Sequence, residues 1–419
     1  MSFSLQHSSL MGSLTAPPAK SHAIRLLAGV AMAKGKSIIY NLGNSSDVRV
    51  AASIVNTHFA DVVIDNNKVL VSSAEKKACN VIDCGESGLI ARLFPVLKLL
   101  QACNFTVEGS GTLLHRPIAL DLKQLNEFGV DIQTPNGNFL PVKFIGGQLK
   151  NGKYKIEGSR SSQFVSGLLM SLPLLDGDSE LLVNDISSFP YIMLTVQTLK
   201  SFGINVFHQA PNRFIIPGNQ HYCNGDYVVE GDWSSAAFLF AAGVLLGKVS
   251  ISGLNPYSEQ SDKNILEILQ LANVDFAYEN GIYSVQKSKI LAFDYDFMHS
   301  PDLFPVALLL AVHANGVSRF TGISKLYLKE SNRIDALCKE FSKSGVHIIC
   351  LSEALIVTGN SNLRFAKYNS HNDHRVAMTL ILHALACAEG GEIDSVDCID
   401  KSYPHFLKDI VKIGGLVNE

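Results

Sequence analysis

Apolar and polar positions along the chain follow a pattern that recurs six times. Each unit has a helix-length apolar run opened by polar or charged residues, then a short strand pattern, then an amphipathic helix pattern. A helix that is apolar on all sides belongs in a core, so the apolar runs predict buried helices. These runs are Ser21–Ala33, Ser87–Leu100, Ser161–Leu175, Ser234–Leu246, Asp302–Ala314 and Asp373–Ala388.

The amphipathic halves of most units end in a shared turn signal. A Gly or Asn follows the last helical residue, and a β-branched residue or Leu comes next, which is typical of a left-handed helix C-cap leading into a strand. The signal occurs in 126–130, 201–204, 271–274, 342–346 and 412–416. The strands expected after the buried helices are Ile38–Leu42, Phe105–Gly109, Leu181–Ile186, Val249–Gly253, Ser318–Ile323 and Glu392–Val396. Such self-similarity indicates repeated supersecondary units.

The repeat predicts an α/β (α+β) protein in which each unit supplies one inner and one outer helix, with the sheets outside. A chain of 419 residues exceeds what one core usually organises, so we expect two lobes of three units each. The chain is expected to cross between lobes at Pro17-Pro18 and within Asp226–Glu230. The first lobe is then 18–230, and the second combines 1–17, with an N-terminal strand at Ser2–Ser9, and 231–419.

Composition excludes several classes of protein. A net charge of -3 argues against a nucleic-acid-binding surface, and the chain shows neither a signal peptide nor a membrane-spanning run, so we expect a cytoplasmic protein. The cysteines lack a C-x-x-C pair, which favours reduced thiols and argues against a metal site. They are Cys79, Cys84, Cys103, Cys223, Cys338, Cys350, Cys387 and Cys398.

Positive side chains gather at the starts of the apolar runs and in the loops after the strands. Helix starts carry unpaired N–H groups and a positive dipole end, so converging starts are suited to an anionic ligand. The alternative is that each cation is solvated or pairs with a structural acid. The residues concerned are Lys20, Arg25, Arg92, Arg116, Lys329, Arg333, His374, Arg375 and Lys401.

The first two clusters lie in the N-terminal half of the chain. Lys20 precedes a helix that Ser21 can cap, and Arg25 lies one turn further on the same face, so the three can reach one ligand. A capped helix with an exposed lysine is the alternative. Ser161, Ser162 and Gln163 offer hydrogen-bonding side chains before an apolar run, although they also fit a simple capping cluster.

Three further features carry titratable groups. Lys329 and Arg333 are spaced i,i+4 with Glu330 between them, which also fits a salt-bridged helix surface. Asp302 opens an apolar run, where its carboxylate can cap the helix or act as a base on a hydroxyl. The segment 372–375, Asn-Asp-His-Arg, concentrates titratable groups before a buried helix, which is uncommon in a purely structural loop.

At these residues the chain resembles the 5-enolpyruvylshikimate-3-phosphate synthases, which transfer an enolpyruvyl group from phosphoenolpyruvate to shikimate 3-phosphate. The resemblance runs in order from Lys20 to Phe406. Its most specific parts are the segments 329–333 and 372–375. The segments 20–21, 116–118, 161–163, 230–235 and 401–404 agree with it.

The resemblance implies a two-lobed inside-out α/β barrel of six βαβαββ repeats, three per lobe, that closes over its substrates. It implies that shikimate 3-phosphate is bound by Ser21, Arg25, Ser161, Ser162, Gln163, Ser188, Tyr191, Asp302 and Lys329. Phosphoenolpyruvate is expected at Lys20, Gly88, Arg116, Gln163, Arg333, Arg375 and Lys401.

The implied reaction is an addition followed by elimination of phosphate. Proton transfer is assigned to Asp302, Glu330, Lys20 and His374, with Asp302 near the 5-hydroxyl and Glu330 or Lys20 near the methylene carbon. No metal or organic cofactor is called for, and we expect a monomer that binds neither nucleic acid nor a membrane.

Some positions depart from the family pattern. Glu86 and Leu89 stand where asparagine and threonine are frequent, and Lys325 replaces a frequent asparagine. Glu86 weakens a neighbouring anion site unless a cation such as Arg92 neutralises it. Response to the inhibitor glyphosate is therefore left open.

Two alternatives to this enzyme follow. One is a UDP-N-acetylglucosamine enolpyruvyltransferase, for which the resemblance implies a cysteine in a mobile loop of the first lobe. The corresponding loop here, Ser110–Arg116, contains no cysteine, and Cys103 precedes the strand. The other is a catalytically inactive homologue that only binds.

Overall fold

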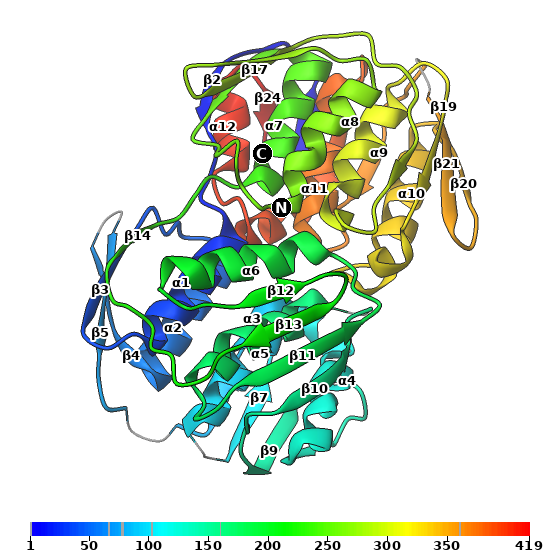
Figure 1. The fold of residues 1–419 in the computed structure, drawn as a ribbon. Coiled ribbons are helices and arrows are strands. Elements are labelled where there is room, and N and C mark those ends of the chain that lie inside the picture. The colour runs from blue at the N-terminus through cyan, green and yellow to red at the C-terminus, as the bar shows by residue number, and fades with distance from the viewer. Residues whose placement is uncertain (1, 66–67, 77–78, 102–103, 160, 360–361) are drawn as a thin grey trace. The chain divides into compact units, whose positions relative to one another are not determined.

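The computed structural model describes residues 2–65, 68–76, 79–101, 104–159, 161–359 and 362–419, so Cys103 lies outside the described residues. The chain divides into two compact units (Figure 1). Unit 1 comprises residues 1–19 and 230–419, and unit 2 comprises residues 20–229. Each unit is described by itself below.

The described part of the chain forms six four-stranded sheets, three in each unit. In every sheet, one edge strand is parallel to its neighbour, and the remaining neighbouring strands are antiparallel. A parallel pair needs a crossover connection, and in four sheets the inner helix of the same repeat supplies it. This arrangement confirms the βαβαββ repeat.

Unit 2 contains the first three repeats. Its inner helices are α1 (Lys20–Met32), α3 (Gly88–Lys98) and α5 (Ser162–Ser171). Its outer helices are α2 (Ser46–His58), α4 (Ile118–Leu122), continued by η3 (Lys123–Phe128), and α6 (Phe189–Ser201). The sheets, in spatial order, are β14 (Asp226–Val228), β3 (Lys36–Tyr40), β5 (Lys68–Ser73), β4 (Ala60–Asp65); β6 (Val81–Asp83), β7 (Phe105–Glu108), β9 (Val142–Gly147), β8 (Val130–Gln133); and β10 (Lys153–Glu157), β11 (Ser179–Asn184), β13 (Arg213–Ile216), β12 (Phe207–Gln209).

Unit 1 contains the other three repeats. Its inner helices are α7 (Trp233–Leu246), α9 (Phe304–Val312) and α11 (His374–Ala386). Its outer helices are α8 (Ile265–Leu271), α10 (Arg333–Lys343) and α12 (Phe406–Lys412). The sheets, in spatial order, are β2 (Leu10–Thr15), β15 (Gly247–Ser252), β17 (Ile282–Gln286), β16 (Phe276–Glu279); β18 (Tyr295–Asp296), β19 (Val317–Thr321), β21 (Ala354–Thr358), β20 (His347–Cys350); and β22 (Lys367–Asn369), β23 (Gly391–Asp394), β1 (Ser2–Gln6), β24 (Leu416–Asn418).

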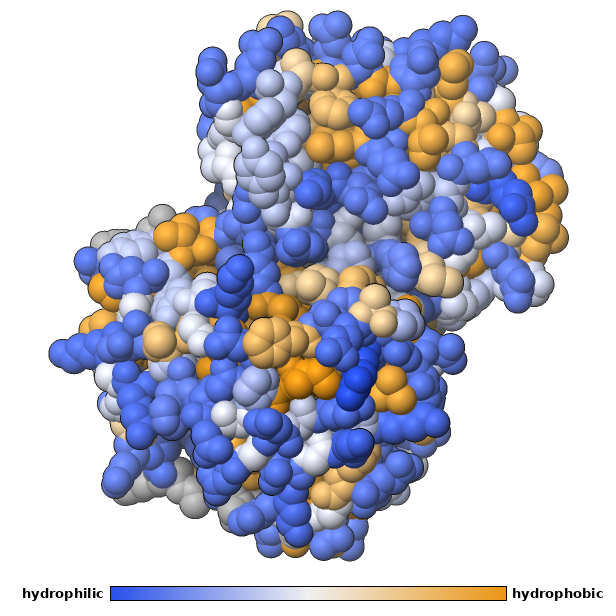
Figure 2. Space-filling view, viewed as in Figure 1, coloured by the Kyte–Doolittle hydropathy of each residue, from blue (hydrophilic) through white to orange (hydrophobic). Residues whose placement is uncertain are grey.

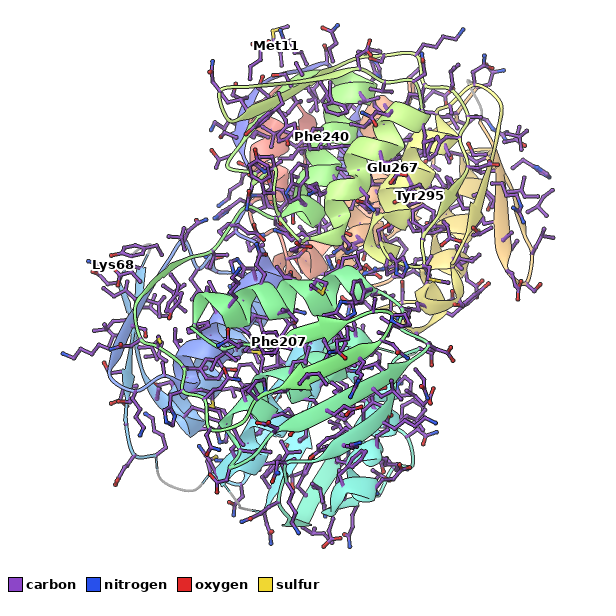
Figure 3. All side chains as sticks on the ribbon, in the orientation of Figure 1. Met11, Lys68, Phe207, Phe240, Glu267 and Tyr295 are labelled. Atoms are coloured by element: carbon purple, nitrogen blue, oxygen red, sulfur yellow. The ribbon has the colours of Figure 1, made fainter. Side chains whose placement is uncertain are left out.

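The inner helices are buried as their apolar sequences predict. Every residue of α3 and α9 is buried, whereas the outer helix α10 buries one side only. In Figure 3, Phe240 of α7 lies among the helices of unit 1, and Met11 of β2 lies on the outside; their exposed fractions are 0% and 77%. The sheets therefore form the outer layer of each unit, with one face against the helices.

The turns after the outer helices also confirm the sequence pattern. Gly129 after η3 has φ +83°, and Asn273 after α8 has φ +57°. The same left-handed region is occupied by Gly203, Gly345 and Gly414. Residues with small or polar side chains are required there because a bulky side chain is disfavoured at positive φ.

The N-terminal segment differs from the single strand expected at Ser2–Ser9. It forms two strands in two sheets of unit 1: β1 pairs with β23 and β24, and β2 pairs in parallel with β15. The hydroxyl of Ser8 donates to the carbonyl of Gln6 between the strands, which breaks the extended run. The strand pattern alone cannot show this break, because both halves alternate in the same way.

The surface carries scattered apolar residues on a largely hydrophilic background (Figure 2). Among the described residues, no helix is long and apolar enough to cross a membrane.

Candidate active site

In unit 1, six charged side chains form one connected group around Arg333, which we call the Arg333 cluster. Arg333 is 1% exposed, and its guanidinium donates through Nη1 to Oδ1 of Asp302 (2.7 Å) and through Nε to Oδ2 of Asp373 (2.8 Å). Its Nη2 donates to Oε2 of Glu330 at 2.6 Å. The cluster consists of Asp302, Lys329, Glu330, Arg333, Asp373 and Arg375.

Helix starts position the members of the Arg333 cluster. Asp302 lies in the short 3-10 turn Pro301–Leu303 that leads into α9, and Arg333 is the first residue of α10. Asp373 is the N-cap of α11, where its Oδ1 accepts from the backbone N–H of Arg375 at 2.9 Å. A capping aspartate uses only part of its acceptor capacity on the helix, so its other oxygen is available to Arg333.

Asp302 contacts three cations of the cluster. Besides Arg333, the Nζ of Lys329 lies 3.1 Å from Oδ1 and the Nη2 of Arg375 lies 3.4 Å from Oδ2. Burial alone raises the pKa of Asp302, but the positive charges of Arg375, Lys329 and Arg333 outweigh burial and hold it well below 3.8. Asp302 is therefore ionised at neutral pH and, in this arrangement, a weak base.

The pairing of Arg333 with Glu330 agrees in part with the alternative of a salt-bridged helix surface. Lys329 is not on that helix, because it follows the 3-10 turn Ser324–Leu328 in an extended conformation and precedes α10. The two cations meet at Asp302 through the fold and not through helical spacing. In addition, the three cations of the cluster are balanced by its three carboxylates, so an anionic ligand must compete with Asp302 or Glu330 for them.

A second buried acid lies close to this cluster. Asp262 is 0% exposed, and its carboxylate accepts from the hydroxyls of Ser234 and Ser261. Burial raises its pKa to about 6, the charge of Arg375 acts in the opposite direction, and Asp302 adds to the rise. Asp262 and Asp302 thus titrate as interacting neighbours, which the sequence analysis did not anticipate.

Two other predicted residues of unit 1 are also buried. His374 is 1% exposed at the start of α11, with its Nδ1 3.9 Å from Oδ1 of Asp373. Lys401 ends the 3-10 turn Val396–Lys401 and is 6% exposed.

In unit 2, Arg25 connects α1 with α5 and α6. Its Nε donates to Oγ1 of Thr195 (2.8 Å), and its Nη2 donates to the carbonyl of Tyr191 (3.2 Å) and to Oγ of Ser166 (3.4 Å). Its Nη1 donates to the carbonyl of Ser21 at 2.8 Å. The structure therefore brings three predicted ligand residues together, namely Ser21, Arg25 and Tyr191.

All of these acceptors of Arg25 are neutral oxygens. The side chain is 1% exposed, burial lowers its pKa to about 10, and no carboxylate in the described part of the chain forms a salt bridge with it. A buried cation without an anion is costly, because desolvation is not offset by a counter-charge. Arg25 is thus suited to an anionic ligand, as the sequence analysis expected.

Lys20 and Ser21 differ from their predicted roles at the start of α1. The helix begins at Lys20, so Ser21 lies inside the first turn and is not its cap. The Nζ of Lys20 is not simply exposed but lies 2.9 Å from Oδ2 of Asp47 in α2. A ligand at Lys20 must therefore share this cation with Asp47.

Ser161, Ser162 and Gln163 start α5. The hydroxyl of Ser161 accepts from the backbone N–H of Gln163 at 3.2 Å, so Ser161 is the cap that the simpler interpretation predicted. The Oε1 of Gln163 accepts from Nη1 of Arg92 at 3.2 Å. Ser188 is the N-cap residue of α6 with φ +56°, and its carbonyl accepts from the N–H of Tyr191.

Gly88 and Arg116, both predicted to bind phosphoenolpyruvate, lie against each other. A Cβ atom at Gly88 would be 2.7 Å from Nη1 of Arg116 and 2.8 Å from its Cζ. A larger residue at this position of α3 would displace the guanidinium from where it lies. The two residues are 28 apart in sequence, so this contact depends on the fold.

The departures at Glu86 and Leu89 have local explanations. The Oε2 of Glu86 accepts from the backbone N–H (3.0 Å) and the hydroxyl (2.9 Å) of Thr112. Arg92, which was considered as its neutraliser, instead forms a buried ion pair with Asp121 at 2.5 Å. Leu89 is 7% exposed and belongs to the core of unit 2.

Three acids that pair with the predicted cations, Asp47, Asp121 and Asp373, were not among the predicted site residues. Asp373 had a usable signal, because an aspartate directly before a buried helix is an N-cap candidate. Asp47 and Asp121 had none, since acids within helix patterns are usually solvated. Among the described residues, no group of three or more His, Cys, Asp or Glu side chains is arranged to hold a metal ion.

The comparisons with known proteins identify the family of this chain. The family model of EPSP synthase (3-phosphoshikimate 1-carboxyvinyltransferase) matches residues 5–410. The chain belongs to the EPSP synthase family. A 3-phosphoshikimate 1-carboxyvinyltransferase of Brachyspira hyodysenteriae is 37% identical over 425 residues, covering 100% of both chains. One from Clostridium acetobutylicum is 34% identical over 416 residues, covering 98% of this chain and 96% of the relative.

Solved structures show the same fold. EPSP synthase from Acinetobacter baumannii superposes with a TM-score of 0.84 at 22% identity, covering 100% of this chain and 99% of that one. An enolpyruvyl transferase from Streptomyces tendae has a TM-score of 0.82 at 17% identity, covering 100% of this chain and 98% of that one. This member of the EPSP synthase family therefore has the two-lobed fold of six repeats that the resemblance implied.

Proposed function

We propose that the protein transfers the enolpyruvyl group of phosphoenolpyruvate to the 5-hydroxyl of shikimate 3-phosphate and releases phosphate. The observation that carries this proposal is the family match over residues 5–410, which includes every predicted ligand residue of both units. The fold alone does not identify the acceptor substrate, because the enolpyruvyl transferase from Streptomyces tendae has the same fold under a different name. This reaction belongs to the biosynthesis of aromatic amino acids.

Arg25 is the residue that we assign to the phosphate of shikimate 3-phosphate, with the hydroxyls and amide of Ser161, Ser162 and Gln163. Its neutral acceptors and full burial support this role, because an incoming phosphate supplies the counter-charge that Arg25 lacks. Ser21, Ser188 and Tyr191 complete this group, together with Asp302 and Lys329 of unit 1. We propose that the two units are the two lobes of the fold.

We assign phosphoenolpyruvate to Lys20, Gly88, Arg116, Gln163, Arg333, Arg375 and Lys401. Its phosphate and carboxylate match the paired donors of arginine. Arg333 and Arg375 contact Asp302 in this structure, so binding requires them to exchange a carboxylate of the protein for one of the substrate. Such an exchange keeps both arginines paired with an anion, whereas Asp302 loses part of its positive surroundings.

This exchange also gives Asp302 the properties of a catalytic base. Its pKa is low because Arg375, Lys329 and Arg333 surround it, despite its burial. When substrate anions bind these cations, the cations stabilise the Asp302 carboxylate less. The pKa of Asp302 then rises toward that of a general base. We therefore assign Asp302 to the 5-hydroxyl, and Glu330 or Lys20 to the methylene carbon, with His374 as the remaining candidate.

Release of phosphate from phosphoenolpyruvate with shikimate 3-phosphate as acceptor tests the proposal. Asp302→Ala and Glu330→Gln are each expected to reduce turnover at least about a hundredfold, because a general acid or base contributes that much. Glu353→Gln changes an exposed carboxylate of unit 1 and serves as the matched control, with turnover close to wild type. The fluorescence of Trp233, the single tryptophan, monitors folding of all three variants.

Three results would contradict the proposal. Phosphate release only with UDP-N-acetylglucosamine as acceptor would identify the alternative transferase. Calorimetric binding of shikimate 3-phosphate without any phosphate release would identify an inactive binding homologue. Near-normal turnover of Asp302→Ala or Glu330→Gln would remove that residue from the mechanism. Cytoplasmic location and a monomeric state stay predictions.

A further inference from the structure

Two cysteines of unit 1, outside the set of predicted site residues, lie side by side. The Sγ atoms of Cys338 and Cys350 are 3.1 Å apart, about 1 Å longer than a disulfide bond. Both are free thiols in the structure. Cys338 lies on α10, and Cys350 is the last residue of the edge strand β20.

The backbone holds both cysteines at defined positions. The helix α10 ends in a turn in which the N–H of Val346 donates to the carbonyl of Phe341 at 3.2 Å, and β20 follows directly. Cys350 pairs in register with Leu355 of β21, so neither cysteine lies in a loose loop. The two sulfurs therefore need to approach by only about 1 Å to form a bond.

The two thiols differ in access. Cys350 is exposed and lies between Ile349 and Leu351, which are 43% and 47% exposed, at the edge of unit 1 where Figure 2 shows hydrophobic residues over β20 and β21. Cys338 is partly buried beneath it. Burial, and next the adjacent Cys350 thiol, raise the pKa of Cys338. The accessible thiol of Cys350 therefore reacts first. Once Cys350 is a mixed disulfide, its thiol no longer raises the pKa of Cys338, which favours attack by Cys338.

We propose that Cys338 and Cys350 form a reversible intramolecular disulfide by exchange with a low-molecular-weight disulfide such as oxidised glutathione. The thiolate of Cys350 attacks one sulfur of the small disulfide and releases one small thiol, leaving a mixed disulfide. Cys338 then attacks the sulfur of Cys350 and releases the second small thiol. One small disulfide is reduced to two thiols, which take up the two protons that the protein thiols lose.

This disulfide would attach α10 to the edge of its sheet. Arg333 is the first residue of α10, so the oxidised form constrains the helix that carries the centre of the Arg333 cluster. The chemistry itself needs only the two cysteines and the small disulfide. It is therefore tested by a chemical readout that is independent of the enzymatic activity.

The test is incubation of the native protein with oxidised glutathione, followed by alkylation of free thiols, unfolding and peptide mapping by mass spectrometry. We expect a crosslink between the peptides of Cys338 and Cys350, two fewer titratable thiols from this pair, and full reversal by dithiothreitol. Cys223 is exposed, and its Sγ contacts no other described Sγ atom, so it should carry only a glutathione adduct and serves as an internal control.

Two variants separate the steps. In Cys338→Ser, Cys350 is expected to retain the glutathione adduct, because no thiol resolves it; in Cys350→Ser, Cys338 is expected to stay reduced. If wild-type Cys350 retains the adduct as fully as it does in Cys338→Ser, or stays unmodified while Cys223 reacts, the proposal is wrong. Cys338→Ala replaces Cys338→Ser if the latter does not fold.

Discussion

Removing the carboxylate of Asp373 tests whether the Arg333 cluster holds unit 1 together. Asp373 is 0% exposed and accepts from Nε of Arg333 at 2.8 Å, from Oγ of Ser331 at 3.1 Å and from the backbone N–H of Arg375 at 2.9 Å. Asp373→Ala leaves part of the charge of Arg333 buried without a partner and removes the cap of α11. Asp373→Asn removes the charge but keeps an oxygen that can cap the helix.

Breaking one side of a buried ion pair costs about 3–5 kcal/mol. Asp302 and Glu330 still pair with Arg333, at 2.7 and 2.6 Å, so we take the lower end of that range. Loss of an N-cap adds about 1 kcal/mol. The free energy of unfolding is therefore expected to fall by about 4 kcal/mol in Asp373→Ala and about 3 kcal/mol in Asp373→Asn.

Urea unfolding followed by the fluorescence of Trp233 measures these changes. Trp233 is the single tryptophan of the chain and is fully buried on α7, so its signal reports unit 1. Asp397→Asn, at an exposed position of the same unit, is the matched control and should stay within about 0.5 kcal/mol of wild type. A loss below about 1 kcal/mol in Asp373→Ala would show that the cluster contributes little to stability.

Two further predictions concern unit 2 and the core of unit 1. Gly88→Ala displaces the guanidinium of Arg116, which lies 2.7 Å from the new Cβ, so the KM for phosphoenolpyruvate should rise at least about tenfold with little change for shikimate 3-phosphate; an unchanged KM would refute the assignment of Arg116. The Nε2 of His313 lies 3.0 Å from Nδ1 of His383, and burial lowers the pKa of His313 to about 4. Because the unfolded chain binds this proton more tightly than the folded chain does, His313 should lower the free energy of unfolding by about 2 kcal/mol when the pH falls from 8 to 5. In His313→Asn this loss should shrink when urea unfolding is measured at both pH values, and an equal loss would contradict the assignment.

The repeat could be read from the sequence because burial leaves a local mark. An inner helix such as α9 is buried on every side, so every position of Phe304–Val312 is apolar, and the pattern needs no knowledge of its neighbours. The turn at Gly129 is equally local, since its positive φ restricts the residue type directly. The break between β1 and β2 was missed because it depends on which sheet each half joins.

The candidate site likewise has parts that the sequence identifies and parts that only the fold brings together. Residue types and motifs identified the cations, and the resemblance in segments 329–333 and 372–375 identified the family. The partners of those cations were not visible in the sequence, because Lys20 and Asp47, or Arg92 and Asp121, are brought together only when helices pack. Their separation along the chain carries no periodic signal.

The sequence by itself therefore determined the repeat and the buried helices, and it predicted the kind of ligand. Only the tertiary structure decided that the three cations of the Arg333 cluster are already paired, whereas Arg25 is surrounded by neutral oxygens. The physical reason is that burial and backbone conformation act on single positions, whereas the free energy of a buried charge depends on every group that packs against it.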